Sequence, residues 1–243
     1  MRRLQMYKIR TLIVILAAIL LFGCAQVRIT GSGNVVTQEE GITGFDKVDI
    51  SQSFSVDITQ GESFRVVIRV DDNLVEHLNV VKQGSTLKIG LDPSRAYTIV
   101  NATMEAEVTM PELVGLDLSG SSDANVSGFE SSKSLVVDLS GNSDLLGDIQ
   151  AGDTRFDVSG NSSVIMTGSA GDVSVDASGS SEVDLTDYPA SDANVDASGA
   201  STVTVNLSGR LNADASGSSN IYYLGDPELG SIDTSGSSNI QPK

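Results

Sequence analysis

The sequence predicts an all-β protein, a right-handed parallel β-helix with rungs of about 19 residues. The motif Asp-x-Ser-Gly occurs seven times in its carboxy-terminal half, at intervals of 21, 19, 19, 20, 18 and 19 residues. Apolar and polar residues alternate around each copy, which is the period of a β-strand. A motif repeated at nearly constant spacing indicates stacked coils. Its aspartates and serines are Asp117 and Ser119, Asp138 and Ser140, Asp157 and Ser159, Asp176 and Ser178, Asp196 and Ser198, Asp214 and Ser216, and Asp233 and Ser235.

Residues 1–23 resemble a bacterial signal peptide. Four basic residues precede an apolar run, Thr11 to Phe22, that is about half as long as the roughly 20 residues needed to span a bilayer. The run ends in Leu21-Phe22-Gly23-Cys24, which resembles a lipobox, and Cys24 is the only cysteine. We therefore expect a lipid on Cys24 that anchors the protein to a membrane. A signal peptide cut elsewhere and an uncleaved anchor are the alternatives.

The next two segments are expected to lead into the repeats. Residues 24–38 read as a short tether that runs into a first strand, with a flexible Gly31-Ser32-Gly33. Residues 39–111 alternate polar and β-branched residues, which predicts further strands. Pro111 is expected to end the last of them. With residues 112–243, this amino-terminal β part forms one continuous domain.

Two local features stand out within residues 39–111. Residues 71–78 fit one helical turn, which Asp71 or Asp72 could cap. Residues 80–89 fit a hairpin around Gln83-Gly84-Ser85. His77, the only histidine, falls in the helical turn and is expected at a surface or boundary.

In residues 112–243 each rung contains two or three short strands. The residues on either side of each motif aspartate are mostly apolar and share the inward face, so the aspartate and serine point outward. A looser third side absorbs the variation in rung length. The alternative fold is a β-sandwich, whose hairpin spacings vary more than these intervals do. The inward residues of the second strands are Ala124, Val126, Leu145, Gly147, Val164, Met166, Val183, Leu185, Val203, Val205, Ile221, Tyr223 and Ile240.

The motif has a structural explanation. Its glycine supplies a corner with positive φ, and the serine and aspartate side chains can accept backbone N–H groups left unpaired there. Stacked coils would also place the seven aspartates about 5 Å apart, where each pair repels by about 0.8 kcal/mol in water. Bound Ca²⁺ could offset this repulsion. The sequence lacks the nine-residue period of calcium solenoids, and we expect no cofactor, with calcium as the alternative.

The composition excludes several classes of function. The chain has 32 acidic and 15 basic residues, and without residues 1–23 the charge is −21, from 11 basic residues. Nucleic acid and anionic lipid surfaces are therefore disfavoured as partners. The basic residues of the repeats are scattered, and one distant histidine makes no Ser-His-Asp set, so no enzyme is predicted. There is no Trp, and Tyr188 and Tyr222 are expected to form a small outward patch.

The order of segments resembles the bacterial family called "putative auto-transporter adhesin, head GIN domain", over about residues 30–243. This resemblance implies a β-helical envelope domain, often lipid-anchored and of unknown biochemical function, with no catalytic residues to carry over. A true autotransporter would continue into a β-barrel, which is not expected after residue 243. The similar segments are Gly31-Ser32-Gly33-Asn34-Val35-Val36, Gly44-Phe45-Asp46-Lys47-Val48, Val56-Asp57-Ile58-Thr59-Gln60-Gly61, Asp71-Asp72-Asn73-Leu74 and Gly84-Ser85-Thr86-Leu87-Lys88-Ile89.

We therefore expect a non-catalytic lipoprotein of the bacterial envelope that offers a surface for adhesion or for another envelope protein. A β-helix that binds or acts on polysaccharide, with a surface glycan as partner, is the alternative, and a structural stalk or sensor component is a third. Ala25 after the anchored cysteine favours the outer membrane. The last rung, which contains Ile240, has no evident cap, so weak self-association or a cap formed by the tail is expected there.

Overall fold

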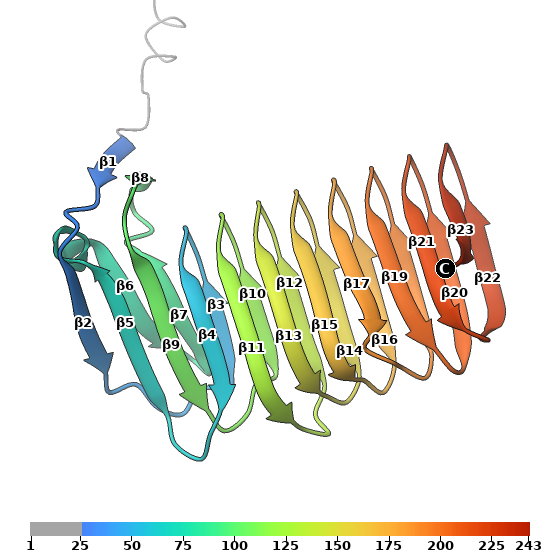
Figure 1. Ribbon diagram of the computed structural model, residues 1–243, viewed down its shortest axis with the longest axis horizontal. Coiled ribbons are helices and arrows are strands. Elements are labelled where there is room, and N and C mark those ends of the chain that lie inside the picture. Colours follow the sequence, from blue (N-terminus) through green and yellow to red (C-terminus); the bar gives the residue numbers. More distant parts are fainter. Residues whose placement is uncertain (1–25) are drawn as a thin grey trace, which may run out of the picture.

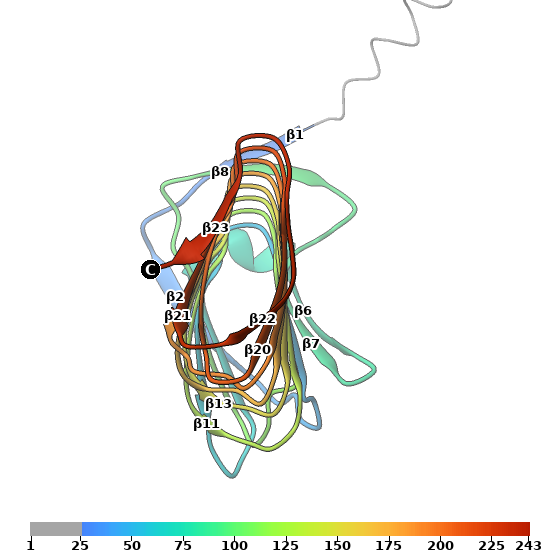
Figure 2. The same ribbon diagram turned by 90° about the vertical axis from the view of Figure 1, so that its right-hand side faces the viewer.

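The computed structural model describes residues 26–243, so the predicted signal peptide and Cys24 lie outside the described residues. Two large β-sheets, one of 10 strands and one of 11, lie face to face along the molecule (Figure 1, Figure 2). Most neighbouring strands are parallel, and the rungs are about 20 residues long. The predicted all-β fold of stacked parallel coils is confirmed.

Each coil of the repeat region contributes one strand to each sheet. The looser third side contains turns in place of a regular strand. The 10-stranded sheet takes β10 (Gly115–Leu118), β12 (Leu135–Leu139), β14 (Thr154–Val158), β16 (Val173–Ala177), β18 (Ala193–Ala197), β20 (Arg210–Ala215) and β22 (Glu228–Thr234). The 11-stranded sheet takes β11 (Asp123–Glu130), β13 (Asp144–Gln150), β15 (Ser163–Ser169), β17 (Glu182–Asp187), β19 (Thr202–Leu207), β21 (Asn220–Gly225) and β23 (Asn239–Pro242).

The amino-terminal part builds its coils out of chain order. Strands β3 and β4 form one coil, and β10 and β11 stack directly on it. The chain between β4 and β10 runs to the amino-terminal end of the solenoid. There β7 and β9 form a further coil, which stacks on the other side of β3 and β4. The elements are β1 (Gln26–Thr30), β2 (Val35–Glu40), β3 (Lys47–Ile50), β4 (Ser55–Gln60), β5 (Arg65–Asp71), η1 (Asp72–His77), β6 (Leu78–Gln83), β7 (Thr86–Leu91), β8 (Ala96–Val100) and β9 (Met104–Met110).

Antiparallel strands close the amino-terminal end. Strands β5 and β2 extend the 11-stranded sheet, and β6 extends the other sheet as the hairpin partner of β7. Strand β1 pairs with β8 in a separate two-stranded sheet. Residues 24–38 were expected to be a short tether that runs into a first strand. In the described part of this range, β1 and the first half of β2 are paired strands of the fold.

The predicted helical turn and hairpin are both present. Element η1 is a short 3₁₀ helix, but the Asp71 carboxylate does not cap it. Asp71 is only 1% exposed and accepts the backbone N–H groups of Gly33, at 2.5 Å, and Thr103, at 2.6 Å. One buried carboxylate at the end of β5 therefore holds both the glycine segment predicted to be flexible and the residue that precedes β9. Within residues 26–243, no helix is long and apolar enough to cross a bilayer.

One apolar core fills the space between the two sheets. Most of the predicted inward residues of the second strands are buried, with Val164, Leu185 and Val203 fully covered. At the carboxy-terminal end, Tyr223 and Ile240 are partly buried. The buried cluster runs through the coils as far as β21, and Ile232 and Ile240 of the last coil pack against it, so residues 26–243 make a single folding unit.

Candidate functional site

The corner of each coil forms as the motif predicts. The seven motif glycines have φ between 73° and 82° and stack on one another. A Cβ at Gly141 would collide with the carbonyl oxygen of Gly120, and the same clash recurs down the column. Glycine is therefore required both for the positive φ and for the close approach of successive corners.

An eighth copy of the motif precedes the seven that the sequence shows. Asp49-Ile50-Ser51-Gln52 aligns with the motif because Asp49 pairs with Asp117 in the parallel register of β3 and β10. Gln52 adopts φ = 67° at the position of the glycine. This copy was not predicted, because Gln52 stands where the motif has glycine. The alternation Val48-Asp49-Ile50 followed by serine was the available signal.

Serines line the inside of the corners, and those of all coils but the last are buried. Each lies three residues after a motif serine, and most donate their hydroxyl to its carbonyl oxygen, as Ser122 does to Ser119 at 2.9 Å. In the first coil, Phe54 takes the equivalent place. The motif serines were predicted to accept N–H groups, but Ser119 and Ser159 donate to carbonyl oxygens of the preceding coil. The inner serines are Ser122, Ser143, Ser162, Ser181, Ser201, Ser219 and Ser238.

The motif aspartates form one ladder on the outer face of the 10-stranded sheet. Strand pairing places Asp49, Asp117, Asp138, Asp157, Asp176, Asp196, Asp214 and Asp233 in a continuous register. Their carboxylates were predicted to accept corner N–H groups. Within residues 26–243 these carboxylates instead contact side chains, among them Lys88, Arg155 and Ser231.

Two carboxyl groups of the ladder, those of Asp117 and Asp138, have raised pKa values. Burial raises the pKa of the Asp117 carboxyl, and the neighbouring charges of Asp49 and Asp138 raise it further. Burial and then Asp157 raise the pKa of Asp138, against a smaller opposing effect of Arg155. Like charges on adjacent strands and partial removal from water both disfavour the ionised form. The folded state therefore contains electrostatic repulsion between neighbouring carboxylates of the ladder.

A lysine ends the ladder on its amino-terminal side. Lys88 on β7 lies next in register to Asp49, and its Nζ donates to the Asp49 carboxylate at 2.5 Å. This hydrogen bond, followed by the charge of Asp49, raises the pKa of Lys88. The side chains are 37% and 23% exposed, so water screens the pair only in part. The pair neutralises the first carboxylate of the row.

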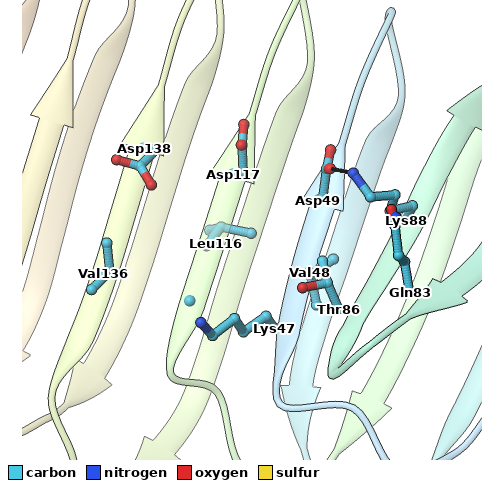
Figure 3. Close-up of a pocket in the computed structure, with 11 residues that line it drawn as sticks. Lys47, Val48, Asp49, Gln83, Thr86, Lys88, Leu116, Asp117, Val136 and Asp138 are labelled. Carbon is cyan, nitrogen blue, oxygen red and sulfur yellow. Dashed lines mark hydrogen bonds and ion pairs between the residues drawn. The ribbon is translucent and has the colours of Figure 1, made fainter. Parts of the chain in front are cut away.

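A groove of about 390 Å³ lies at this head of the ladder. Figure 3 shows Lys47 extended over β10, with Asp49, Asp117 and Asp138 along one side and Lys88 at one end. A Cβ at Gly115 would come within 3.1 Å of Lys47 Cγ, so the glycine makes room for this side chain. The groove combines two ammonium groups with three carboxylates, and such a set can bind a polar ligand through hydroxyl and acidic groups.

A metal centre is not apparent in the described part of the chain. Residues 26–243 contain no cluster of three or more histidine, cysteine, aspartate or glutamate side chains that could hold an ion. The ladder carboxylates stand in a row and do not converge on one point. The seven predicted aspartates and serines are thus brought together as columns along the sheet.

A family model matches residues 44–227, and its description is "Putative auto-transporter adhesin, head GIN domain". The chain belongs to this family. The match covers the ladder of this head GIN domain from Asp49 to Asp214, and the groove at its head. The last coil, β22 and β23, follows the matched range.

Three solved structures share the fold of this head GIN domain. A "putative adhesin" from Bacteroides fragilis NCTC 9343 has a TM-score of 0.82 and 20% identity, covering 88% of this chain and 100% of that chain. A "putative lipid binding protein" from Parabacteroides distasonis ATCC 8503 has a TM-score of 0.70 and 22% identity, with 89% and 99% covered. A "putative adhesin" from Parabacteroides merdae ATCC 43184 has a TM-score of 0.67 and 15% identity, with 89% and 99% covered. No curated protein matches the chain.

The two tyrosines that were predicted to form an outward patch do not form one. Tyr188 was expected on the surface, but it is fully buried, and its hydroxyl lies 3.0 Å from Thr154 Oγ1. Its ring packs edge-on against Phe156. Tyr222 is half-buried on β21, so the predicted tyrosine patch does not exist. His77 is a boundary residue as predicted, 15% exposed and packed against a tyrosine ring.

Proposed function

We propose that the protein is a non-catalytic lipoprotein of the bacterial cell envelope whose solenoid is a surface for adhesion or for another envelope protein. Membership in a family described as an adhesin supports a place at the cell surface or in the envelope. A lipid on Cys24 would supply the anchor, and the residue after it, Ala25, favours the outer membrane.

The position of β1 carries this proposal. Its first residue, Gln26, lies two positions after Cys24 and pairs with Ala96 on β8. Strands β1 and β8 lie at the end of the solenoid opposite β22 and β23 (Figure 1). An anchor at Cys24 would therefore hold one end of the solenoid at the membrane and present the coils and the far end to partners.

Two measurements test the anchor. In producing cells, the wild-type protein is expected to incorporate labelled palmitate and to sediment with membranes. The Cys24→Ala variant is expected to lose the label. Retention of the label by the variant would contradict lipidation at Cys24, and a wild-type protein that sediments with membranes without any label would indicate an uncleaved anchor.

A binding assay tests the adhesive surface. Beads that carry residues 24–243 are expected to attach to intact envelopes of the producing bacterium, and beads with an unrelated acidic protein are not. Treating the envelopes with protease identifies a protein partner, and treating them with periodate identifies a glycan. Equal attachment by both kinds of bead would contradict a specific adhesive surface.

Polysaccharide binding is the second candidate function, and the groove at the ladder head favours it. Lys47 makes no ion pair within residues 26–243 and lies beside Asp117 and Asp138. The lysine could bind an acidic sugar while the carboxylates accept sugar hydroxyl groups. The Lys47→Gln variant is expected to weaken binding of acidic glycans at least tenfold by titration calorimetry, while the control Lys133→Gln binds as the wild type does. Equal affinity of all three proteins would contradict a site at this groove.

A further inference from the structure

The carboxy-terminal end of the solenoid exposes the end of the apolar core. Leu229 and Ile232 on β22 stand in register with the buried Leu211 and Ala213 of the preceding coil. Nothing stacks on them within residues 26–243, and Leu229 is 50% exposed. Ile240 on β23, in register with the buried Ile221, is likewise only partly covered.

Both sheets also end there with open edges. Strand β22 is the last strand of the 10-stranded sheet, and β23 is the last of the 11-stranded sheet. An edge strand presents unpaired backbone groups that can pair with another chain. Figure 2 looks onto this end, with β22 and β23 nearest the viewer. The end is therefore an apolar strip between two free strand edges.

The opposite end is closed. Element η1 covers it, with Leu74 fully buried beneath the 3₁₀ helix. The antiparallel strands β2, β5 and β6 surround the end, and the chain outside the described range joins here, at Gln26. Only the carboxy-terminal end of the described chain offers two open parallel edges with core between them.

We propose that this end binds the same end of a second copy of the chain. A partner that covers it completely must bring two strand edges at the separation of the two sheets, with apolar residues between them. The same end of another copy meets this requirement. A two-fold axis perpendicular to the solenoid places each edge strand antiparallel to an edge strand of the partner, and such an interface is closed and self-complementary.

The size of the end predicts a weak dimer. A strand of seven residues is about 23 Å long, and two packed sheets with their side chains are about 20 Å thick, which gives on the order of 450 Å² per copy. A standard-size interface buries about 800 Å² per partner. The regular edges are shorter still, because β22 has a register shift beside Gly230 and β23 contains Pro242. Glu228 and Asp233 add like charges, so added salt should strengthen the contact.

This inference rests on the proposed function and names its partner. If Cys24 anchors the amino-terminal end, then two copies joined at their carboxy-terminal ends are anchored on opposite sides of the contact. Such a dimer connects two membrane surfaces. Many weak contacts between two surfaces act together, so a dimer of low affinity suffices for adhesion.

Vesicle clumping tests the proposal. Residues 24–243 are coupled through the thiol of Cys24, the only cysteine, to phosphatidylcholine vesicles that carry a maleimide lipid. The reverse orientation uses Cys24→Ser with a cysteine added after Lys243. Turbidity is expected to rise with protein density for the first vesicles and to stay at the level of bare vesicles for the second. Equal clumping in both orientations, or none in either, overturns the proposal.

Point variants locate the contact. Leu229→Lys and Ile240→Lys are each expected to weaken clumping at least tenfold, and sedimentation equilibrium of the soluble proteins should show the same loss of dimer. Val81→Lys is the matched control, because Val81 is 43% exposed on β6, the edge strand at the opposite end. Thermal melting confirms that each variant is folded. Wild-type clumping by the first two variants, or loss with the control alone, overturns the proposal.

The same vesicles separate this inference from the proposed function. Vesicles that bind native envelopes but not one another would leave an adhesive role in place and overturn the contact between the carboxy-terminal ends of two copies. Vesicles that bind neither would overturn both. Clumping abolished by an excess of soluble residues 24–243, but not by the soluble Leu229→Lys variant, is the supporting result.

Discussion

Replacing Asp138 by asparagine should stabilise the protein at neutral pH. Asp138 stands between Asp117 and Asp157 in the ladder, and neighbouring strands are about 4.8 Å apart. Two unit charges at this distance repel by about 0.9 kcal/mol in water, and 0.1 M salt reduces each term to about 0.5 kcal/mol. Removing two such pairs gives about 1 kcal/mol, or a rise of about 2–4 °C in Tm for a chain of this size.

The pH dependence of this gain has a definite sign. The folded-state pKa of Asp138 is raised, so the native state binds its proton more readily than the unfolded state does. The wild type therefore gains stability from this group as the pH falls through the raised pKa, and loses it as the pH rises. Asp138→Asn lacks the dependence. Its advantage should be full near pH 7 and should vanish below about pH 3, where carboxylates are protonated.

Calorimetric melting of the two proteins measures this difference. The difference in Tm between the wild type and Asp138→Asn is measured at pH 7 in 0.1 M salt, at pH 7 in 1 M salt and at pH 3. The advantage should shrink in 1 M salt, where the Debye length is about 3 Å. Asp226→Asn, which removes an exposed loop charge outside the ladder, is the control and should shift Tm by less than a third as much. A lower Tm for Asp138→Asn at pH 7, or a rise independent of pH and salt, would refute the reasoning.

The remaining predictions concern the corner, the buried tyrosine and calcium. Gly141→Ala should lower the free energy of unfolding by more than about 2 kcal/mol, because φ is 82° and the added Cβ would meet the Gly120 backbone. Gly84→Ala, where φ is 64° and the space is open, should lower it by about 1 kcal/mol. Chemical denaturation measures both. Tyr188→Phe should cost about 1–3 kcal/mol by the same assay, because the Thr154 hydroxyl loses its buried partner. Thermal melting at low ionic strength should give one midpoint in calcium and in chelator, and a higher midpoint in calcium would contradict this.

The regular coils were predictable because their register is constant. Each strand pairs with the next at the same motif position, as Asp157 with Asp176 and Asp176 with Asp196, so a repeat in the sequence becomes a column in space. The period of two then decides which residues point inward. Local turn chemistry was sufficient for the hairpin of β6 and β7 and for the strand end at Pro111.

The head of the ladder was not predictable, because it depends on contacts between distant segments. Asp49 and Asp117 are separated in the chain by β4 to β9, and only the parallel pairing of β3 with β10 brings them together. The copy of the motif that begins at Asp49 has Gln52 in place of glycine, and a positive φ is rare for a residue with a side chain, so the corner there was not expected. Lys88 reaches Asp49 through an additional pairing, between β3 and β7.

Tyr188 shows a second limit of sequence reasoning. It follows the end of β17 at Asp187, where the alternation of inward and outward residues no longer applies. The ring turns into the core against Phe156, and Thr154 on β14 of the preceding coil supplies the hydroxyl partner. A bulky residue on the irregular third side is therefore placed by the space available between coils, and this space depends on side chains of other rungs.

The ladder is best explained by the register it enforces. Glycine and the inner serines form the corner, and the aspartates add repulsion that Lys88 offsets at one end and Arg155 offsets beside Asp157. However, a slip of one residue in any coil would turn its aspartate into the apolar core, where an unpaired carboxylate is very unfavourable. A polar amide at the same position keeps this penalty while it removes the repulsion. Asp138→Asn should therefore melt at a higher temperature with unchanged cooperativity, whereas Asp138→Val should broaden the transition because alternative registers become accessible.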